Sequence, residues 1–195
     1  MATHELFHLG NPTLEEKKLP WLVEGFTTYY QDVLRGRRGA AEAARMWGDL
    51  YDGCHRFGDP EGGVSLEEES RRLRESHNYP RVYWGGACLA LRLDVAIRER
   101  SGNTRSLDDV MRDLRRRSAA RPFTAARILD ELARETGDSP SVIARTGGFA
   151  RAHLRATRPL GLDELYRRLG LEPTGSASVK LLDDAPLAPI RRGIF

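Results

Sequence analysis

Apolar residues recur at helical spacing along most of the chain. In the segment 20–36, four of them fall on one side of a helix that Gly36 would end. They are Leu22, Phe26, Tyr29 and Val33. A later segment, 82–97, is apolar on nearly all sides, which predicts a buried central helix.

Capping residues predict where several other helices begin. Ser65 and Glu68 form the pattern of a capping box. Ser106 with Asp109 repeats it, and Thr124 is a further N-cap residue. The remaining helices are expected over 3–10, 40–56, 139–146 and 162–169.

No segment alternates between apolar and polar residues over a useful length, and no internal repeat is present. The sequence therefore predicts an all-α fold with one domain over 1–172. The last segment, 173–195, contains Gly, Ser and Pro with little periodicity. It is expected to be a C-terminal tail.

Composition is typical of a globular chain, with 40% hydrophobic and 30% charged residues among 195. No apolar run approaches the roughly 20 residues that span a bilayer, so no membrane partner is expected. The chain does not open with a basic stretch followed by an apolar one, as a signal peptide does. These features predict a cytoplasmic location.

The basic isoelectric point, about 9.1, raises the question of nucleic-acid binding. The net charge is only +3, and the Arg residues are interleaved with Asp and Glu along every expected helix, as in LDDVMRDLRRR. A nucleic-acid binder more often gathers its charge on one stripe with aromatic residues between. No nucleic-acid partner is therefore expected.

The chain has two cysteines, Cys54 and Cys88, which are far apart and do not form a CxxC pair. In a cytoplasmic protein such residues are usually reduced. They are expected to be ordinary helix residues with unpaired thiols, and neither a disulfide nor a metal site.

The N-terminal helix carries the motif His4-Glu5-Leu6-Phe7-His8, which is HExxH. Residues four apart are only about 40° apart around a helix, so both imidazoles can face one ion. Glu5 lies about 100° from His4, beside the metal, where it can accept a proton from water that the metal activates. By residue usage, the pattern arises by chance in roughly one chain in a hundred of this length. It predicts a catalytic zinc site.

A catalytic zinc site needs a third protein ligand and an open position. A metzincin would carry Gly and His at positions 11 and 14, where this chain has Asn11 and Leu14. The best candidate is Glu24 on the following helix, opposite its apolar stripe. Taken alone, Glu24 is typical of a solvated glutamate, but Trp21 and Thr28 flank it, which indicates that this face also packs. The other histidines are expected on the surface or in helix packing: His55, His77 and His153.

The pair THELFHLGN and WLVEGFTTYY resembles the glycyl aminopeptidase family, a member of the gluzincin metallopeptidases together with thermolysin. The segments 82–114 and 148–171 extend the likeness over most of residues 3–172. The resemblance implies the helical subdomain of a thermolysin-like catalytic domain, with zinc bound by three residues of this chain. They are His4, His8 and Glu24.

The resemblance also assigns two catalytic residues. Glu5 would be the general base, and Tyr83 matches the tyrosine of a Tyr-x-Lys-Gly element that stabilises the oxyanion. The alternative for Tyr83 is another aromatic residue at the start of a buried helix. Two positions depart from the family pattern, since Gly85 replaces the lysine and Gly10 replaces a tryptophan. The upstream β-rich region and the PDZ-like module are also not evident.

The predicted function is zinc-dependent, aminopeptidase-like hydrolysis of peptide substrates. The alternative is a truncated or degenerate relative that binds zinc or a partner protein without catalysis. With no upstream cover, Phe7 and the helix 82–97 are expected to leave a large apolar patch exposed beside the metal. Self-association or a second polypeptide would then bury that patch.

Overall fold

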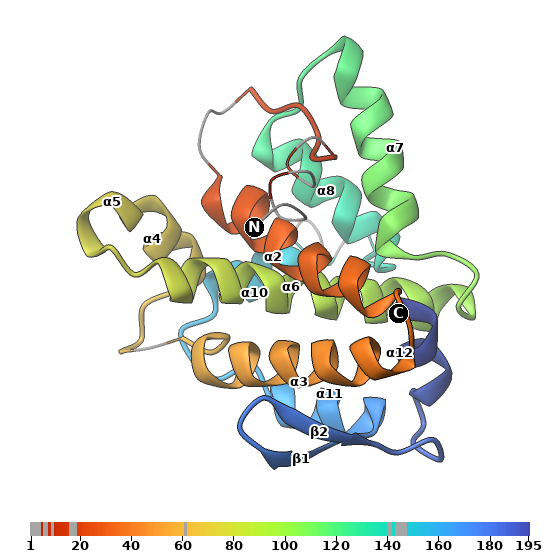
Figure 1. Cartoon of the computed structure of the whole chain (residues 1–195). Helices are drawn as coiled ribbons and strands as arrows, with labels where there is room; N and C mark the ends of the chain where they lie inside the picture. Colours follow the sequence, from red (N-terminus) through yellow and green to blue (C-terminus); the bar gives the residue numbers. More distant parts are fainter. Residues whose placement is uncertain are drawn as a thin grey trace.

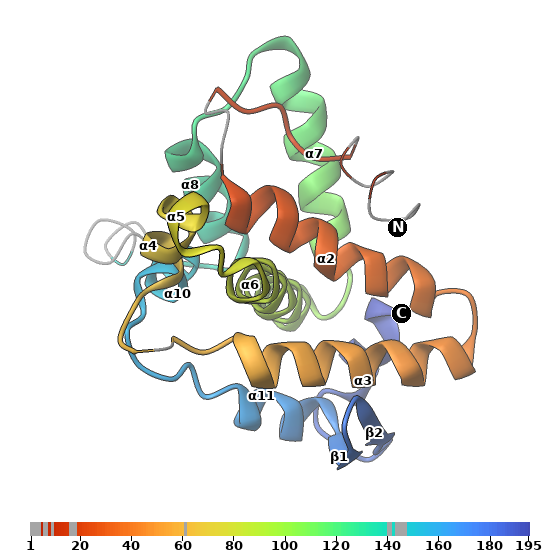
Figure 2. The same ribbon diagram turned by 60° about the vertical axis from the view of Figure 1, so that its left-hand side comes forward.

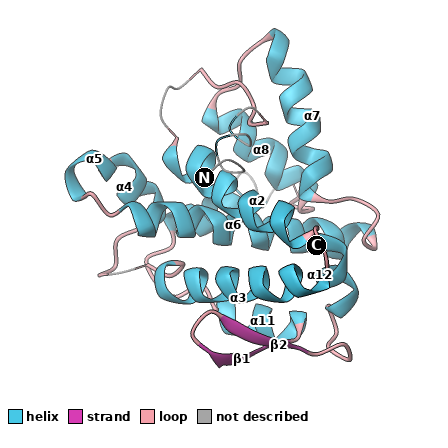
Figure 3. Cartoon of the chain, viewed as in Figure 1, coloured by secondary structure: helices cyan, strands magenta, loops and turns pink. Residues whose placement is uncertain are grey.

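The computed structural model describes residues 5, 8, 10–15, 19–60, 62–139, 142 and 148–195. Their regular structure is mainly helical, which confirms the expected class (Figures 1 and 3). The larger helices are α2 (Pro20–Gly36), α3 (Ala40–Phe57), α6 (Tyr79–Ser101), α7 (Leu107–Ala120) and α8 (Ala125–Glu135). The shorter ones are α4 (Leu66–Arg71), α5 (Leu73–Ser76), α10 (Gly148–Arg155), α11 (Leu162–Leu169) and α12 (Ala188–Ile194).

Helix α6 is the centre of the fold. Figure 2 looks nearly along its axis, with α2 on one side and α3 on the other. Most of its apolar side chains between Val82 and Ile97 are buried, as the sequence predicts, and Tyr83, Trp84 and Ala96 are half-buried. Within the described ranges, no helix is long and apolar enough to cross a bilayer.

The expected exposed apolar patch on the helix 82–97 is wrong, because its apolar side chains are buried or half-buried. Among the described residues, the only large hydrophobic side chains that are exposed are Leu34 and Tyr79. Phe7, the other part of that expectation, lies outside the described residues, as does most of the helix expected over 139–146.

Local capping chemistry sets the helix starts as predicted. The side chains of Ser65 and Thr124 accept from the backbone N–H groups that open α4 and α8. At α7 both halves of the capping box are present, since Ser106 and Asp109 each bond to the other's backbone. These bonds satisfy N–H groups that have no partner within the helix.

Helices α2 and α6 touch backbone to backbone at a pair of glycines. A Cβ atom on Gly25 would overlap the Cα atom of Gly86, and one on Gly86 would overlap the carbonyl oxygen of Trp21. Only glycine therefore fits at either position. Because Glu24 precedes Gly25 and Tyr83 lies one turn before Gly86, this contact also sets the distance between those two side chains.

A single buried carboxylate, Asp94, joins three helices. It accepts hydrogen bonds from the Tyr29 hydroxyl of α2 at 2.8 Å, from Nε of Arg98 at 2.9 Å and from the backbone N–H of Leu107 at 2.8 Å. Four groups that would each be costly to bury alone are thus satisfied together.

The segment 173–195 is not the irregular C-terminal tail that the sequence suggests. Strands β1 (Leu171–Gly175) and β2 (Ser178–Leu181) form an antiparallel hairpin against α3, and α12 follows. Phe195 stacks on Trp47 with ring centroids 4.7 Å apart, and Ile194 is fully buried. The strands are too short and too polar to show an alternating pattern, so they form because α3 supplies the packing surface.

The expectation of unpaired thiols is also wrong. Cys54 of α3 and Cys88 of α6 form a disulfide, with Cα atoms 5.7 Å apart. The two residues are 34 positions apart in the chain, and they meet because the two helices cross at this point. Sequence spacing carries no information about such a crossing.

Candidate functional site

His8 and Glu24 are brought together on one face of α2. Nε2 of His8 lies 3.6 Å from Oε2 of Glu24, and each side chain is 27% exposed. This separation is longer than a hydrogen bond. Two ligands bound at about 2.0–2.2 Å to one tetrahedral zinc ion lie about 3.3–3.6 Å apart, so the separation fits two ligands of one ion.

Thr27 favours one position for the ring hydrogen of His8. The Thr27 hydroxyl donates to the carbonyl oxygen of Val23 at 2.6 Å, so its proton is engaged. Its oxygen lies 3.4 Å from Nδ1 of His8, where it can only accept. In a neutral His8 this contact favours the tautomer with hydrogen on Nδ1, in which the lone pair of Nε2 is on the side of Glu24.

Asn11 completes this support. Its Nδ2 donates to the Thr27 oxygen at 3.3 Å, and its backbone N–H donates to the carbonyl oxygen of His8 at 3.3 Å. Both Asn11 and Thr27 are buried. Sequence reasoning used Asn11 to exclude the metzincin class, and it missed Thr27. The signal for Thr27 was its position one turn after Glu24, on the same face of the helix.

Tyr83, in the second turn of α6, faces Glu24. Burial raises the pKa of Tyr83, and the Glu24 carboxylate raises it further both by its charge and as a hydrogen-bond partner. Tyr79 and the Glu5 carboxylate add to the same effect. Tyr83 therefore keeps its proton at neutral pH and is a hydrogen-bond donor. Glu5 is exposed and within electrostatic reach of this phenol.

Four of the five predicted site residues can be located, and they gather around Glu24. The backbone of Glu5 and of His8 is helical, as the motif requires. His4 lies outside the described residues. Among the residues that are described, no group of three His, Cys, Asp or Glu side chains could hold a metal. The assignment of three zinc ligands therefore stays a prediction. In its favour, His8 and Glu24 place a nitrogen and an oxygen at a separation that suits two ligands of one ion.

The other histidines lie elsewhere, on the surface or in helix packing. His55 stacks on Tyr51 with ring centroids 5.6 Å apart. His77 is exposed after α5. His153 is buried with its Nδ1 atom 3.0 Å from a guanidinium nitrogen of Arg92.

Comparisons with models of known families, with curated proteins and with solved structures found no match to this chain. Membership of the glycyl aminopeptidase family and a thermolysin-like arrangement therefore remain hypotheses. They depend on the motif residues and on the geometry around Glu24.

Proposed function

We propose that this chain is a zinc-dependent, aminopeptidase-like hydrolase of peptides, with His4, His8 and Glu24 as the metal ligands. The observation that supports this most is the pair His8 and Glu24, whose Nε2 and Oε2 atoms lie 3.6 Å apart, with the Thr27 oxygen against the other ring nitrogen of His8. A histidine oriented through its second ring nitrogen is typical of zinc ligands.

When bound, zinc polarises the peptide carbonyl and lowers the pKa of water. In the proposed reaction Glu5 accepts a proton from the attacking water and passes it to the leaving amine. Tyr83 donates a hydrogen bond to the carbonyl oxygen as negative charge develops there. Its raised pKa suits this role, because a phenol that stays protonated remains a donor throughout the reaction.

Partial exposure of the site supports a catalytic zinc site over a purely structural one. Structural zinc sites are closed by four protein ligands, whereas catalytic sites keep one position open. The side chains of His8 and Glu24 are both reachable from solvent at 27% exposure. A peptide carbonyl can therefore approach this position.

Zinc content and hydrolysis of an alanyl or glycyl amide, each with and without a chelator, test the proposal. The wild-type chain is expected to bind one zinc and to lose its hydrolysis with the chelator. Glu24→Gln is expected to lower zinc affinity by at least about tenfold. Glu172→Gln, on the exposed hairpin, is the matched control and should behave as wild type. A Glu24→Gln protein that binds zinc as tightly as wild type would remove the ligand assignment.

The second candidate is a non-catalytic zinc-binding relative, and Gly85 favours it. This position replaces the lysine of the family's Tyr-x-Lys-Gly element. A Cβ atom here would overlap a guanidinium nitrogen of Arg81 and lie 2.8 Å from a Leu66 methyl carbon, so a larger side chain would have to displace Arg81 and Leu66. One bound zinc per chain without turnover of any small peptide amide would select this candidate.

A further inference from the structure

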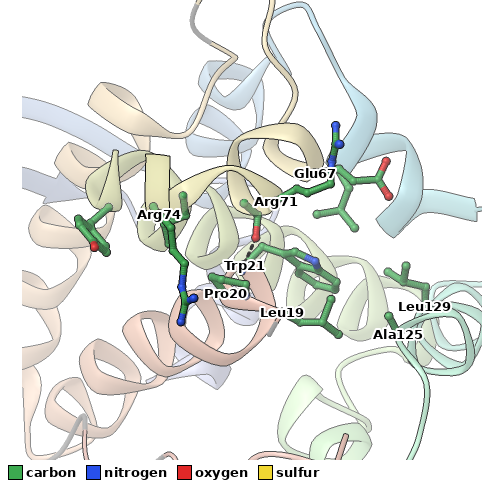
Figure 4. Close-up of a pocket in the computed structure, with 12 residues that line it drawn as sticks. Leu19, Pro20, Trp21, Glu67, Arg71, Arg74, Ala125 and Leu129 are labelled. Carbon is green, nitrogen blue, oxygen red and sulfur yellow. Dashed lines mark hydrogen bonds between the residues drawn. The ribbon is translucent and has the colours of Figure 1, made fainter. Parts of the chain in front are cut away.

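A cavity of about 490 Å³ lies between the start of α2, the α4–α5 segment and α8. Its walls are mainly apolar and include Leu19, Trp21, Leu73, Leu129 and Leu154. In Figure 4, Trp21 lies in the middle, with Arg74 on one side and Ala125 and Leu129 on the other. Its volume is in the range of small-molecule sites, roughly 300–1,000 Å³.

The cavity begins one helical turn from the candidate metal centre. Tyr79 lines it, and the Tyr79 ring lies edge-on to the Tyr83 ring with centroids 6.2 Å apart. On α2, Trp21 is likewise one turn before Glu24. One helical turn is about 5 Å, and an extended peptide advances about 3.3 Å per residue. The cavity is thus one to two peptide residues from the site where the carbonyl would bind.

Among the described residues at the rim of the cavity, one cation has no ion-pair partner. Glu67 pairs with Arg155, with Nε and Oε2 3.1 Å apart, and Arg71 pairs with Glu68. Arg74 forms no ion pair with any residue in the described part of the chain. The cavity therefore combines an apolar interior with a positive charge at its edge. This combination suits a ligand that is apolar and carries one carboxylate.

Resting on the metallopeptidase function proposed above, we propose that this cavity binds the C-terminal residue of a short peptide substrate. The apolar side chain of that residue fills the cavity against Trp21 and Leu129, and Arg74 holds its free carboxylate. A terminal residue is the part of a peptide that offers both groups together. The substrate class is therefore dipeptides and tripeptides that end in a large apolar residue.

Binding of N-acetyl-phenylalanine and of N-acetyl-phenylalaninamide to the full chain, measured by calorimetry, tests this without catalysis. The acid is expected to bind at least about tenfold more tightly than the amide, because a charge-assisted bond to arginine is lost in the amide. Arg74→Gln should abolish the preference. Arg38→Gln, which changes an exposed arginine just beyond the C-terminal end of α2, should retain it.

A filled cavity provides the second variant. Ala125→Phe places a ring in the space between Trp21 and Leu129 and should weaken both ligands, while circular dichroism and melting temperature show that the protein is folded. Equal binding of acid and amide by wild type, or an unchanged preference in Arg74→Gln, would overturn the inference.

The same titration in Glu24→Gln separates this inference from the proposed function. The acid preference should persist there, because Arg74 and the cavity do not depend on the metal. When both proteins are loaded with zinc, the Arg74→Gln variant should have a higher KM for alanyl-phenylalanine than wild type and a kcat within about twofold of the wild-type value. Preserved binding without any hydrolysis would remove the proposed enzyme and leave a peptide-binding site. Hydrolysis without acid preference would remove the cavity assignment alone.

Discussion

Nε2 of His8 and Oε2 of Glu24 lie 3.6 Å apart, although the two residues belong to different segments of the chain. Neither segment alone positions both groups. The Thr27 hydroxyl, on the same face of α2 as Glu24, lies against the other nitrogen of His8. The α2 helix thus provides one candidate ligand and the residue that orients another.

Replacing Thr27 tests the orientation of His8. Thr27→Val keeps the shape of the side chain and removes the oxygen that Nδ1 of His8 faces. Zinc affinity is expected to fall about 10–100-fold, the range observed for outer-shell partners of metal ligands. Competition with a chromogenic chelator measures it. Thr27→Ser restores the hydroxyl and should recover most of the affinity; if the valine variant binds zinc as wild type, Thr27 does not orient the ligand.

Glu5→Gln separates metal binding from proton transfer. The variant loses the proposed proton acceptor and keeps all three proposed ligands. Zinc content should therefore stay near the wild-type value, while hydrolysis of an alanyl amide falls by at least about 100-fold. Atomic absorption and a fluorogenic assay measure the two quantities on the same preparation. Wild-type turnover in this variant would show that Glu5 is not the base.

Gly25→Ala tests the close contact of α2 with α6. The added methyl group has no space beside Gly86, so the helices must move apart. The free energy of unfolding is expected to fall by about 2–3 kcal/mol, as for overpacked cores. Gly175→Ala, where a Cβ atom meets nothing within 4 Å, is the control. Urea unfolding followed by circular dichroism gives both values, and equal stability of the two variants would contradict the contact.

Asp32 makes stability depend on pH. Burial raises its pKa from 3.8 to about 7, the charge of Asp49 adds to this, and Arg35 opposes it. Between these two values the folded state holds a proton that the unfolded chain has lost, so the free energy of unfolding falls as pH rises. Asp32→Asn removes this fall in the free energy of unfolding. The variant should be more stable than wild type at pH 8, by up to about 4 kcal/mol.

The difference between wild type and Asp32→Asn is the quantity to measure, because His153 acts in the opposite sense. Burial, with a contribution from Arg92, lowers the pKa of His153 from 6.5 to about 3. Its contribution to stability is complete above pH 6.5 and is lost as pH falls toward 3. Chemical unfolding of both proteins at pH 4 to 8 isolates the Asp32 effect. A constant difference across this range would show that Asp32 ionises as in the unfolded chain.

Because of the disulfide, the free energy of unfolding should depend on reductant. Cys54 and Cys88 close a loop across 34 positions, which by the chain-entropy estimate stabilises the fold by about 3–4 kcal/mol. Dithiothreitol should lower the free energy of unfolding by that amount, and the variant with both cysteines changed to serine should not respond. Thiol titration of the unreduced, unfolded chain should find no free thiol. Two reactive thiols there would contradict the disulfide and restore the argument for a reducing compartment.

Local features of the sequence were sufficient for the elements and for part of the site. The helix over 20–36, the buried helix around 82–97 and the caps at Ser65, Ser106 and Thr124 each depend on interactions within a few residues. The spacing in HExxH likewise depends on helix geometry alone. Periodicity could therefore single out Glu24 as a polar residue on a face that also packs.

Only the tertiary structure decided how these elements meet. The bond between Cys54 and Cys88, the overlap-free fit of Gly25 against Gly86, and the contact of Thr27 with His8 all join separate segments. The hairpin β1–β2 likewise forms against α3 and has too few apolar residues to be stable alone. Sequence patterns report which face of an element is apolar, whereas the partner of that face is selected by packing between residues far apart in the chain.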